Sequence, residues 1–282
     1  MTTPAYVLAL SCPDRPGIVH AVSGVLARAG GNITESGQFS DPGTGRFLMR
    51  VQADVDAGRE ELASAFEPVA REYAMTWRLD VLGRRMRTLV MVSREAHCLN
   101  DLLFRQRSGL LPIEVPAVVS NHTDLTGLAA FYDTDLHHVP VTSRTKPEAE
   151  ARLLALVDEL DVELVVLARY MQVLSDGLCR ALAGRAINIH HSFLPSFKGA
   201  RPYHQAHERG VKLIGATAHY VTSDLDEGPI IEQGVERVDH TMPPAGLRAI
   251  GQDIEAQVLA RAVRWHAEHR VLLDGHRTVV FR

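Results

Sequence analysis

Hydrophobic and polar positions change their spacing several times within the first 82 residues. Residues 6–11 form an apolar run, and apolar positions at helical spacing follow over residues 18–29. Later runs predict a helix at 58–73 and strands at 32–39, 46–55 and 75–81. The order strand–helix–strand–strand–helix–strand is that of the ferredoxin-like α+β unit.

From residue 88 onward, short apolar runs alternate with helical patterns. The predicted strands are 88–93, 113–121, 137–141, 163–168 and 186–191. The predicted helices are 97–107, 124–132, 147–160 and 175–183. This alternation is typical of βαβ units, which build a Rossmann-like, mostly parallel sheet with right-handed crossovers.

A polar, basic segment, residues 83–87, separates the two patterns. It predicts one α+β domain over residues 1–82 and a second, α/β domain over residues 88–282. Beyond Asp253 the pattern predicts a helix to about residue 269, and residues 278–281 predict an edge strand.

Composition excludes several classes of function. Hydrophobic residues make up 46% and charged residues 23% of the chain, which is ordinary for a globular protein. The net charge of −4 provides no basic field for nucleic acid or an anionic membrane. Cys12, Cys98 and Cys179 are widely spaced and odd in number, which indicates free thiols in a reducing cytoplasm.

The candidate chemistry lies between Ile187 and Gln233. Asn188 and His190 are two residues apart in a short predicted strand, so their side chains share a face. Asp226 follows in an Asp-Glu-Gly-Pro turn. An amide donor, an imidazole and a carboxylate can together polarise a carbonyl and move protons beside it. We expect them at the carboxyl end of the sheet, where open α/β sheets bind ligands.

Four motifs in this region carry a resemblance to a known family. They are Asn-Ile-His-x-Ser-x-Leu-Pro (188–195), His-Gln-Ala (204–206), His-Tyr-Val (219–221) and Leu-Asp-x-Gly-Pro-Ile-Ile (225–231). Together they resemble the catalytic core of the folate-dependent formyltransferase-fold enzymes. The His190-His191 doublet and the loop at 196–200 are most similar to the formyltetrahydrofolate deformylases within that group.

The amino-terminal domain carries a second resemblance. Asp14-Arg15-Pro16-Gly17-Ile18-Val19, followed by Gly31-Asn32-Ile33, is similar to the ACT domains. This resemblance implies a homo-oligomer and a site for a small amino-acid effector. The residues expected at that site are Asp14, Arg15, Gly17, Ile18 and Asn32. A purely structural role in assembly is an equally open alternative.

The first resemblance implies hydrolysis of 10-formyltetrahydrofolate to tetrahydrofolate and formate. Asn188 and His190 would stabilise the oxyanion, and Asp226 would manage the water. The residues expected to bind folate are Arg169, Tyr170, Met171, Val173, Leu174, His219 and Asp224. Folate is the substrate, so we expect no cofactor. We also expect no metal, because the histidines lack the close pairing that metal sites use. In a regular strand His191 would face away from His190, and we expect it to form part of the wall of the site rather than to act as a second catalyst.

The acceptor of the formyl group is the main alternative that the sequence leaves open. In the resembled glycinamide ribonucleotide formyltransferases, a Gly-rich loop after the first Rossmann strand holds a phosphate. Residues 93–99 occupy that place here and contain no glycine, and Glu95 would repel a phosphate. Water is therefore the expected acceptor, with transfer to an amine as the alternative, in which Arg94 would hold the phosphate.

Overall fold

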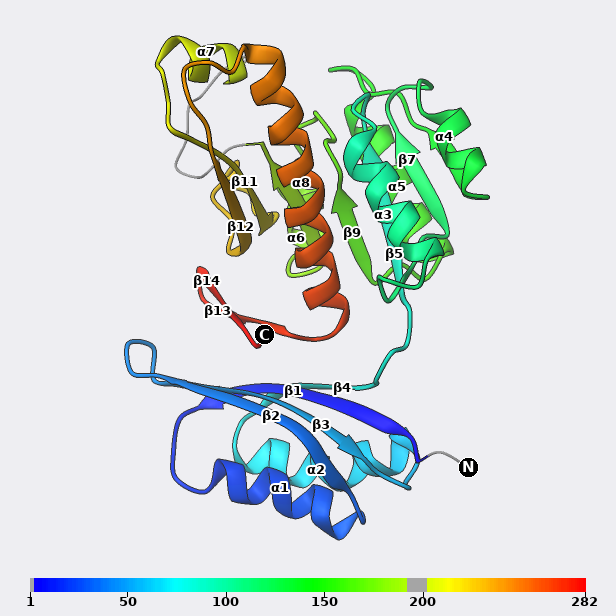
Figure 1. Ribbon diagram of the computed structural model, residues 1–282. Coiled ribbons are helices and arrows are strands. Elements are labelled where there is room, and N and C mark those ends of the chain that lie inside the picture. The colour runs from blue at the N-terminus through cyan, green and yellow to red at the C-terminus, as the bar shows by residue number, and fades with distance from the viewer. Residues whose placement is uncertain (1–2, 192–201) are drawn as a thin grey trace. The chain divides into compact units, whose positions relative to one another are not determined.

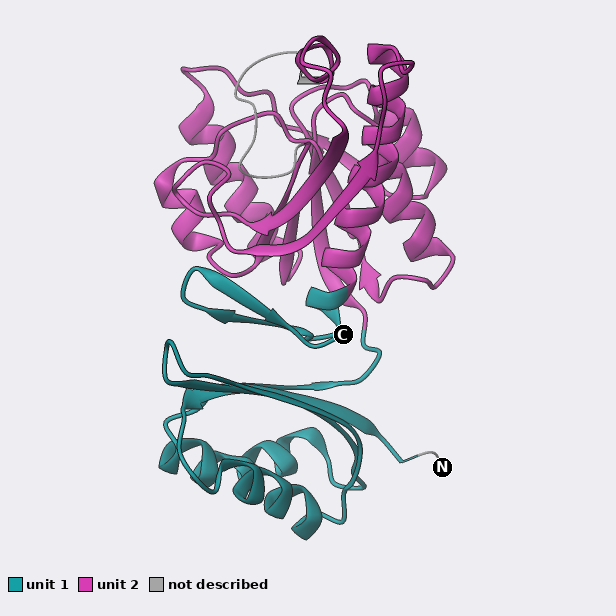
Figure 2. Ribbon diagram, turned by 60° about the vertical axis from the view of Figure 1, so that its left-hand side comes forward, with its two compact units in different colours: residues 1–84, 265–282 teal, residues 85–264 magenta. Residues whose placement is uncertain are grey.

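A computed structural model describes residues 3–191 and 202–282 of the chain (Figure 1). The chain forms two compact units (Figure 2). Unit 1 contains residues 1–84 and 265–282, and unit 2 contains residues 85–264. An α+β unit is thus followed by an α/β unit, and the predicted fold class is confirmed.

Unit 1 has the ferredoxin-like order of elements. They are β1 (Ala5–Pro13), α1 (Ile18–Arg28), β2 (Asn32–Asp41), β3 (Arg46–Asp54), α2 (Arg59–Glu72) and β4 (Thr76–Val81). The strands form an antiparallel sheet in the order β2-β3-β1-β4. Alternate residues of β1 and β3 point toward the two helices and form the core with them, as the period of a strand requires.

The other face of this sheet is covered by a hairpin from much later in the chain. The hairpin consists of β13 (Val271–Asp274) and β14 (Arg277–Val280). Beneath it, Leu48 and Arg50 of β3 are almost fully buried. The Nε and Nη2 atoms of Arg50 donate hydrogen bonds to the carbonyl oxygen of Glu268, at 3.2 and 3.0 Å.

This hairpin changes the expected division of the chain. The sequence prediction assigned all of residues 88–282 to the second domain, whereas residues 265–282 lie in unit 1. The physical reason is that β3 carries residues that require burial on both of its faces. One face packs against α1 and α2, and the hairpin shields the other.

Unit 2 begins one residue before β5. Its elements are β5 (Met86–Val92), α3 (His97–Arg107), β6 (Ile113–Glu114), β7 (Ala117–Ser120), α4 (Thr126–Phe131), β8 (Asp135–His138), α5 (Lys146–Glu159), β9 (Leu164–Leu167), α6 (Asp176–Ala181), β10 (Ala186–His190), α7 (Pro202–Glu208), β11 (Leu213–Tyr220), β12 (Ile230–Arg237) and α8 (Pro244–Ala267). The sheet order is β12-β11-β10-β9-β5-β7-β8, with β6 beside β5. Strands β5 to β10 run parallel, and β11 and β12 run antiparallel to their neighbours.

The strand order of unit 2 predicts where a ligand binds. After β5 the chain adds β7 and β8 on one side of it, and then returns to place β9 and β10 on the other. Such a reversal opens a crevice beyond the carboxyl ends of the central strands. The segments that follow β5 and β9 lie together at that edge, where the amide of Ser93 donates to the carbonyl of Arg169.

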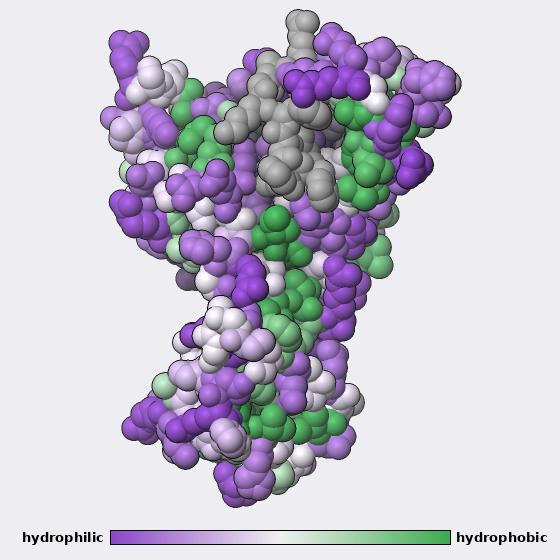
Figure 3. Space-filling view, turned by 90° about the vertical axis from the view of Figure 1, so that its left-hand side faces the viewer, coloured by the Kyte–Doolittle hydropathy of each residue, from purple (hydrophilic) through white to green (hydrophobic). Residues whose placement is uncertain are grey.

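On the face shown in Figure 3, hydrophilic side chains predominate and hydrophobic ones form separate patches. Within residues 3–191 and 202–282, we find no helix with the length and apolar character needed to span a membrane.

Candidate active site

Strands β10 and β11 place three polar side chains together. Asn188 and His190 lie on the same face of β10, and β11 runs antiparallel beside it. The register sets Asn188 directly opposite His219. The Nδ2 atom of Asn188 consequently lies 3.2 Å from Nε2 of His219.

Asp226 reaches this cluster from the turn between β11 and β12. Its backbone adopts the left-handed conformation, with φ at 58°, which Asp and Asn tolerate better than most residues. Two residues later, the backbone of Gly228 passes very close to Tyr220. A Cβ atom at Gly228 would lie 1.7 Å from the carbonyl oxygen of Tyr220, so only glycine fits. The amide of Tyr220 also donates to the carbonyl of Pro229, at 2.9 Å, which closes the turn.

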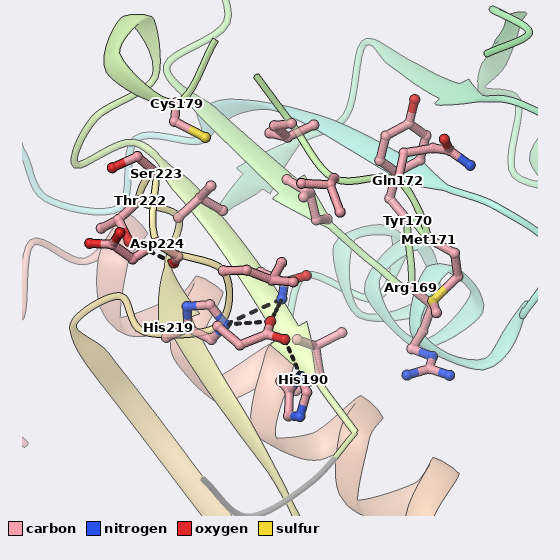
Figure 4. A pocket seen from close by; sticks show the side chains of 18 of the residues that line it. Arg169, Tyr170, Met171, Gln172, Cys179, His190, His219, Thr222, Ser223 and Asp224 are labelled. Atoms are coloured by element: carbon pink, nitrogen blue, oxygen red, sulfur yellow. Dashed lines mark hydrogen bonds and ion pairs between the residues drawn. The ribbon is translucent and has the colours of Figure 1, made fainter. Parts of the chain in front are cut away.

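The carboxylate of Asp226 lies between the two imidazoles (Figure 4). Oδ2 is 3.2 Å from Nδ1 of His190, and Oδ1 is 3.7 Å from Nε2 of His219. Asn188 Nδ2 is 3.5 Å from the same Oδ1. Nδ1 of His219 faces the carbonyl oxygen of Tyr220 at 2.9 Å, so it carries a proton.

Hydrogen bonds set the protonation of this cluster. The hydrogen bond from His190, and next that from His219, hold the pKa of Asp226 well below its usual range, although partial burial opposes them. The group is therefore a carboxylate at any physiological pH. An ionised carboxylate beside an imidazole stabilises the charged, imidazolium form of that ring.

A cavity of about 240 Å³ opens beside the cluster. Asn188, His190 and Asp226 line it together with all the residues that we expected to bind folate: Arg169, Tyr170, Met171, Val173, Leu174, His219 and Asp224. The sequence analysis missed other lining residues, namely Gln172, Cys179, Val221, Thr222, Ser223 and Leu225. For Thr222, Ser223 and Leu225 the available signal was their place in the mostly polar loop that leads to Asp226.

Some residues that line the cavity are exposed to solvent, and others are buried. Met171 and Val173 are 59% exposed and Leu225 is 64% exposed, so they form an apolar rim at the mouth of the cavity. His219, in contrast, is buried, and it contacts Asn188, Asp226 and Tyr220. We infer that His219 orients the cluster.

His191 forms part of the cavity wall, as expected, but it does not face away from His190. Strand β10 ends at His190, so the alternation of faces does not extend to His191. The two rings stack, with centroids 4.9 Å apart, and His191 also lines the cavity. Burial, then the positive charges of Arg169 and His190, lower the pKa of His191 to about 4, so its ring is neutral at pH 7. Ser192 and the loop at 196–200 lie outside the described residues.

The segment after β5 forms contacts with α8. Glu95 accepts hydrogen bonds from Arg248 at 2.6 Å and from Gln252 at 3.0 Å. Ser93 faces the cavity loop instead: its amide donates to the carbonyl of Arg169 at 3.2 Å, and its Oγ accepts from the amide of Met171 at 3.0 Å. A carboxylate thus stands where the transferase-type loop would need phosphate donors.

The expected effector residues of unit 1 do not form a single site within the chain. Asp14 bonds to Ser40, and Arg15 donates to the carbonyl of Glu72 at 2.6 Å. Gly17, with φ at 94°, immediately precedes α1, and Ile18 is buried in the core. Asn32 lies beyond the other end of α1, roughly 16 Å away for a helix of that length. There it lines a separate groove.

Comparison with known proteins agrees with the fold of both units. Residues 86–263 match the family model described as formyl transferase, and residues 6–67 match that of the ACT domain. The fold and the site thus define a formyl transferase domain joined to an ACT domain.

Full-length relatives identify the group more narrowly. The chain is 55% identical to a formyltetrahydrofolate deformylase of Corynebacterium sp. (strain P-1), over 98% of both proteins. It is 51% identical to a solved formyltetrahydrofolate deformylase from Burkholderia mallei, with a TM-score of 0.96, covering 99% of this chain and 100% of that one. A glycinamide ribonucleotide transformylase 1 from Symbiobacterium toebii is more distant, at 32% identity and a TM-score of 0.66, over 73% of this chain and 98% of that one. The chain belongs to the formyltetrahydrofolate deformylase family.

Proposed function

We propose that this protein hydrolyses 10-formyltetrahydrofolate to tetrahydrofolate and formate. The observation that supports this most strongly is the cluster of Asn188, His190 and Asp226 at the wall of a cavity with an apolar rim. The pterin and its aryl group need apolar surface, and the formyl group needs donors and a carboxylate beside it. Both are present within one cavity.

The reaction divides among these residues as follows. Water adds to the formyl carbon, and the carbonyl oxygen becomes an oxyanion that Asn188 and the imidazolium of His190 stabilise. The carbon–nitrogen bond then breaks, the departing nitrogen takes one proton that the attacking water gives up, and the acid leaves as formate after losing the other proton to solvent. Asp226 holds His190 through Nδ1 and orients the water through its carboxylate. Its low pKa makes it a weak base in the resting site, so orientation is its main task.

Three features of the site favour water as the acceptor. The segment after β5 carries a carboxylate, Glu95, which would repel a phosphate-bearing amine. Arg248, a cation that could attract such a substrate, is already paired with Glu95 at 2.6 Å. Arg94, the other candidate, lies 4.0 Å from Asp124 and is largely exposed.

The deciding experiment incubates the purified protein with 10-formyltetrahydrofolate alone. We expect stoichiometric release of formate without any added amine, and no effect of millimolar glycinamide ribonucleotide as acceptor or inhibitor. Turnover that requires an amine would support transfer instead. A protein that binds folate but never turns it over would be a sensor, with its function in the ACT domain.

We also propose a role for unit 1. It would assemble the protein into a homo-oligomer and allow a small amino acid to control activity, because unregulated hydrolysis would drain one-carbon units. Since Asn32 and Asp14 lie at opposite ends of α1, one effector site would need residues from two copies of the chain. The formate released would serve purine synthesis. A reducing cytoplasm suits the free, buried Cys12, Cys98 and Cys179.

A further inference from the structure

Glu255 lies in the middle of α8 with only 1% of its side chain exposed. Three segments converge on its carboxylate. Oε2 is 2.8 Å from Nε2 of His97, the first residue of α3, and Oε1 accepts a hydrogen bond from the hydroxyl of Tyr203 in α7, at 2.9 Å. Oε2 is also 3.4 Å from Nε of Arg169, which belongs to the cavity loop after β9.

These partners keep the buried carboxylate charged. Burial alone would raise the pKa of Glu255, but the hydrogen bond from His97 and the positive charge of Arg169 outweigh it and lower the pKa. A buried charge of this kind persists only where its partners are fixed in place. The carboxylate and its three partners are therefore held together as one unit.

Arg169 connects this unit to the cavity. Its backbone has φ at 64°, in the left-handed region that a residue with a long side chain adopts only when its surroundings impose it. Its carbonyl oxygen accepts from the amide of Ser93 at 3.2 Å. Its side chain extends away from those of Tyr170 and Gln172 (Figure 4). The loop is thus fixed from one side by Ser93 and from the other by the pair with Glu255.

Two other roles for this cluster fit less well. His97, Cys98 and Glu255 are close enough to hold a metal ion. However, the guanidinium of Arg169 beside Glu255 repels a cation, and burial raises the pKa of the Cys98 thiol, which disfavours a thiolate ligand. A purely structural anchor for α7 would need only Tyr203, whose ring packs closely against Gly251. It would not explain the pair with Arg169.

We propose that Glu255 is a positioning residue for the deformylase reaction: through Arg169 it holds the loop at 168–174 in the shape that accepts the pterin. It acts at a distance from the reacting atoms and does not touch the formyl group. Its loss should weaken folate binding more than it slows the chemical step. The inference rests on the proposed function, so folate binding is measured separately from turnover.

The test compares Glu255→Gln, which keeps the size of the side chain and removes its charge, with the native protein. We expect KM for 10-formyltetrahydrofolate and Kd for tetrahydrofolate each to rise at least ~10-fold, while kcat changes less than ~3-fold. Asp253→Asn is the matched control, because it removes the same charge from an exposed position on the same helix, and it should leave both constants unchanged.

A double-mutant cycle with Arg169→Met tests whether Glu255 acts through Arg169. If Glu255 acts through Arg169, Glu255→Gln should raise KM by less than ~2-fold when Arg169 is already Met. If Glu255→Gln alone does not fold, the double variant Glu255→Gln/Arg169→Met is used instead, because it leaves no unpaired charge at position 169. It is compared with Arg169→Met in the same assays. An unchanged KM in Glu255→Gln, a fall in melting temperature alone, or additive effects in the cycle would each overturn the proposal. Inactive native protein that still binds tetrahydrofolate would refute the proposed hydrolysis but not the positioning role.

Discussion

Asp226 combines an unusual backbone conformation with an unusual charge state. Its backbone is left-handed, and it remains ionised because its interactions with His190 and His219 lower its pKa. Asn tolerates the same backbone conformation but carries no charge. Asp226→Asn therefore separates the shape of the turn from its electrostatics.

We expect Asp226→Asn to fold and to bind tetrahydrofolate with near-native affinity. Its kcat should fall about 10³-fold, because a neutral amide can neither stabilise the imidazolium of His190 nor orient water as a carboxylate does. Steady-state formate release and equilibrium binding measure the two quantities. A kcat within ~10-fold of the native value would show that Asp226 lacks the role assigned to it.

Only some contacts of the histidines could be predicted from the sequence. The i, i+2 spacing correctly paired Asn188 with His190, because strand periodicity is a local property. The contact of His219 with Asn188 depends on the register between β10 and β11, which arises only when the chain folds. His191 stacks on His190 rather than facing away from it, because the strand ended one residue earlier than expected.

At the scale of elements, the hairpin β13–β14 depends on ionic contacts with the sheet of unit 1. His269 Nε2 lies 3.1 Å from Oδ2 of Asp80 in β4, and Arg84 donates to the same carboxylate. Burial opposes ionisation of Asp80, but the hydrogen bonds from His269 and Arg84 outweigh it, and its pKa is well below the usual range. The ionised form of Asp80 therefore stabilises the fold.

The pH dependence of this contribution follows from the direction of the shift. Because the pKa is lower in the folded than in the unfolded protein, the contribution is complete above the unfolded value, about 3.9, and is lost as the pH falls below it. At pH 7, Asp80→Asn should lower the free energy of unfolding by roughly 3 kcal/mol. The difference from the native protein should shrink below about pH 4. Urea unfolding at several pH values measures it, and a difference that stays constant down to pH 3 would contradict the assignment.

Local signals explain three places where the predicted elements differ from the observed ones. Pro116 supplies no amide for a ladder, so the predicted strand at 113–121 divides into β6 and β7. Helix α8 begins at Pro244, well before the predicted start near Asp253, and proline in the first turn was a usable signal. Strand β13 was missed although Gly275-His276 forms the two-residue loop of a hairpin, with Gly275 at φ 62°.

At the scale of the whole molecule, the division into units predicts how the chain can be shortened. A fragment of residues 85–264 keeps the core of unit 2, including the cavity. We expect it to fold and remain soluble. A fragment of residues 85–282 keeps the hairpin without its sheet, so Arg270 and His269 lose Glu35 and Asp80.

We expect the longer fragment to be less soluble than the shorter one. Size-exclusion chromatography and circular dichroism compare the two directly, with the full chain as the control. Equal solubility and equal melting temperatures would show that the hairpin is stable without the sheet of unit 1. The sequence could not anticipate this difference, because contacts between residues 35 and 270 leave no mark in local periodicity.

The late position of the hairpin in the chain also affects the order of events during synthesis. The ribosome makes residues 1–84 first, but the face of β3 that carries Arg50 stays uncovered until residues 265–282 emerge. Unit 2 lies between them in the chain and can fold earlier. In the nascent chain, one face of the ACT-domain sheet would therefore stay exposed to water or to a chaperone until the catalytic domain has been synthesised.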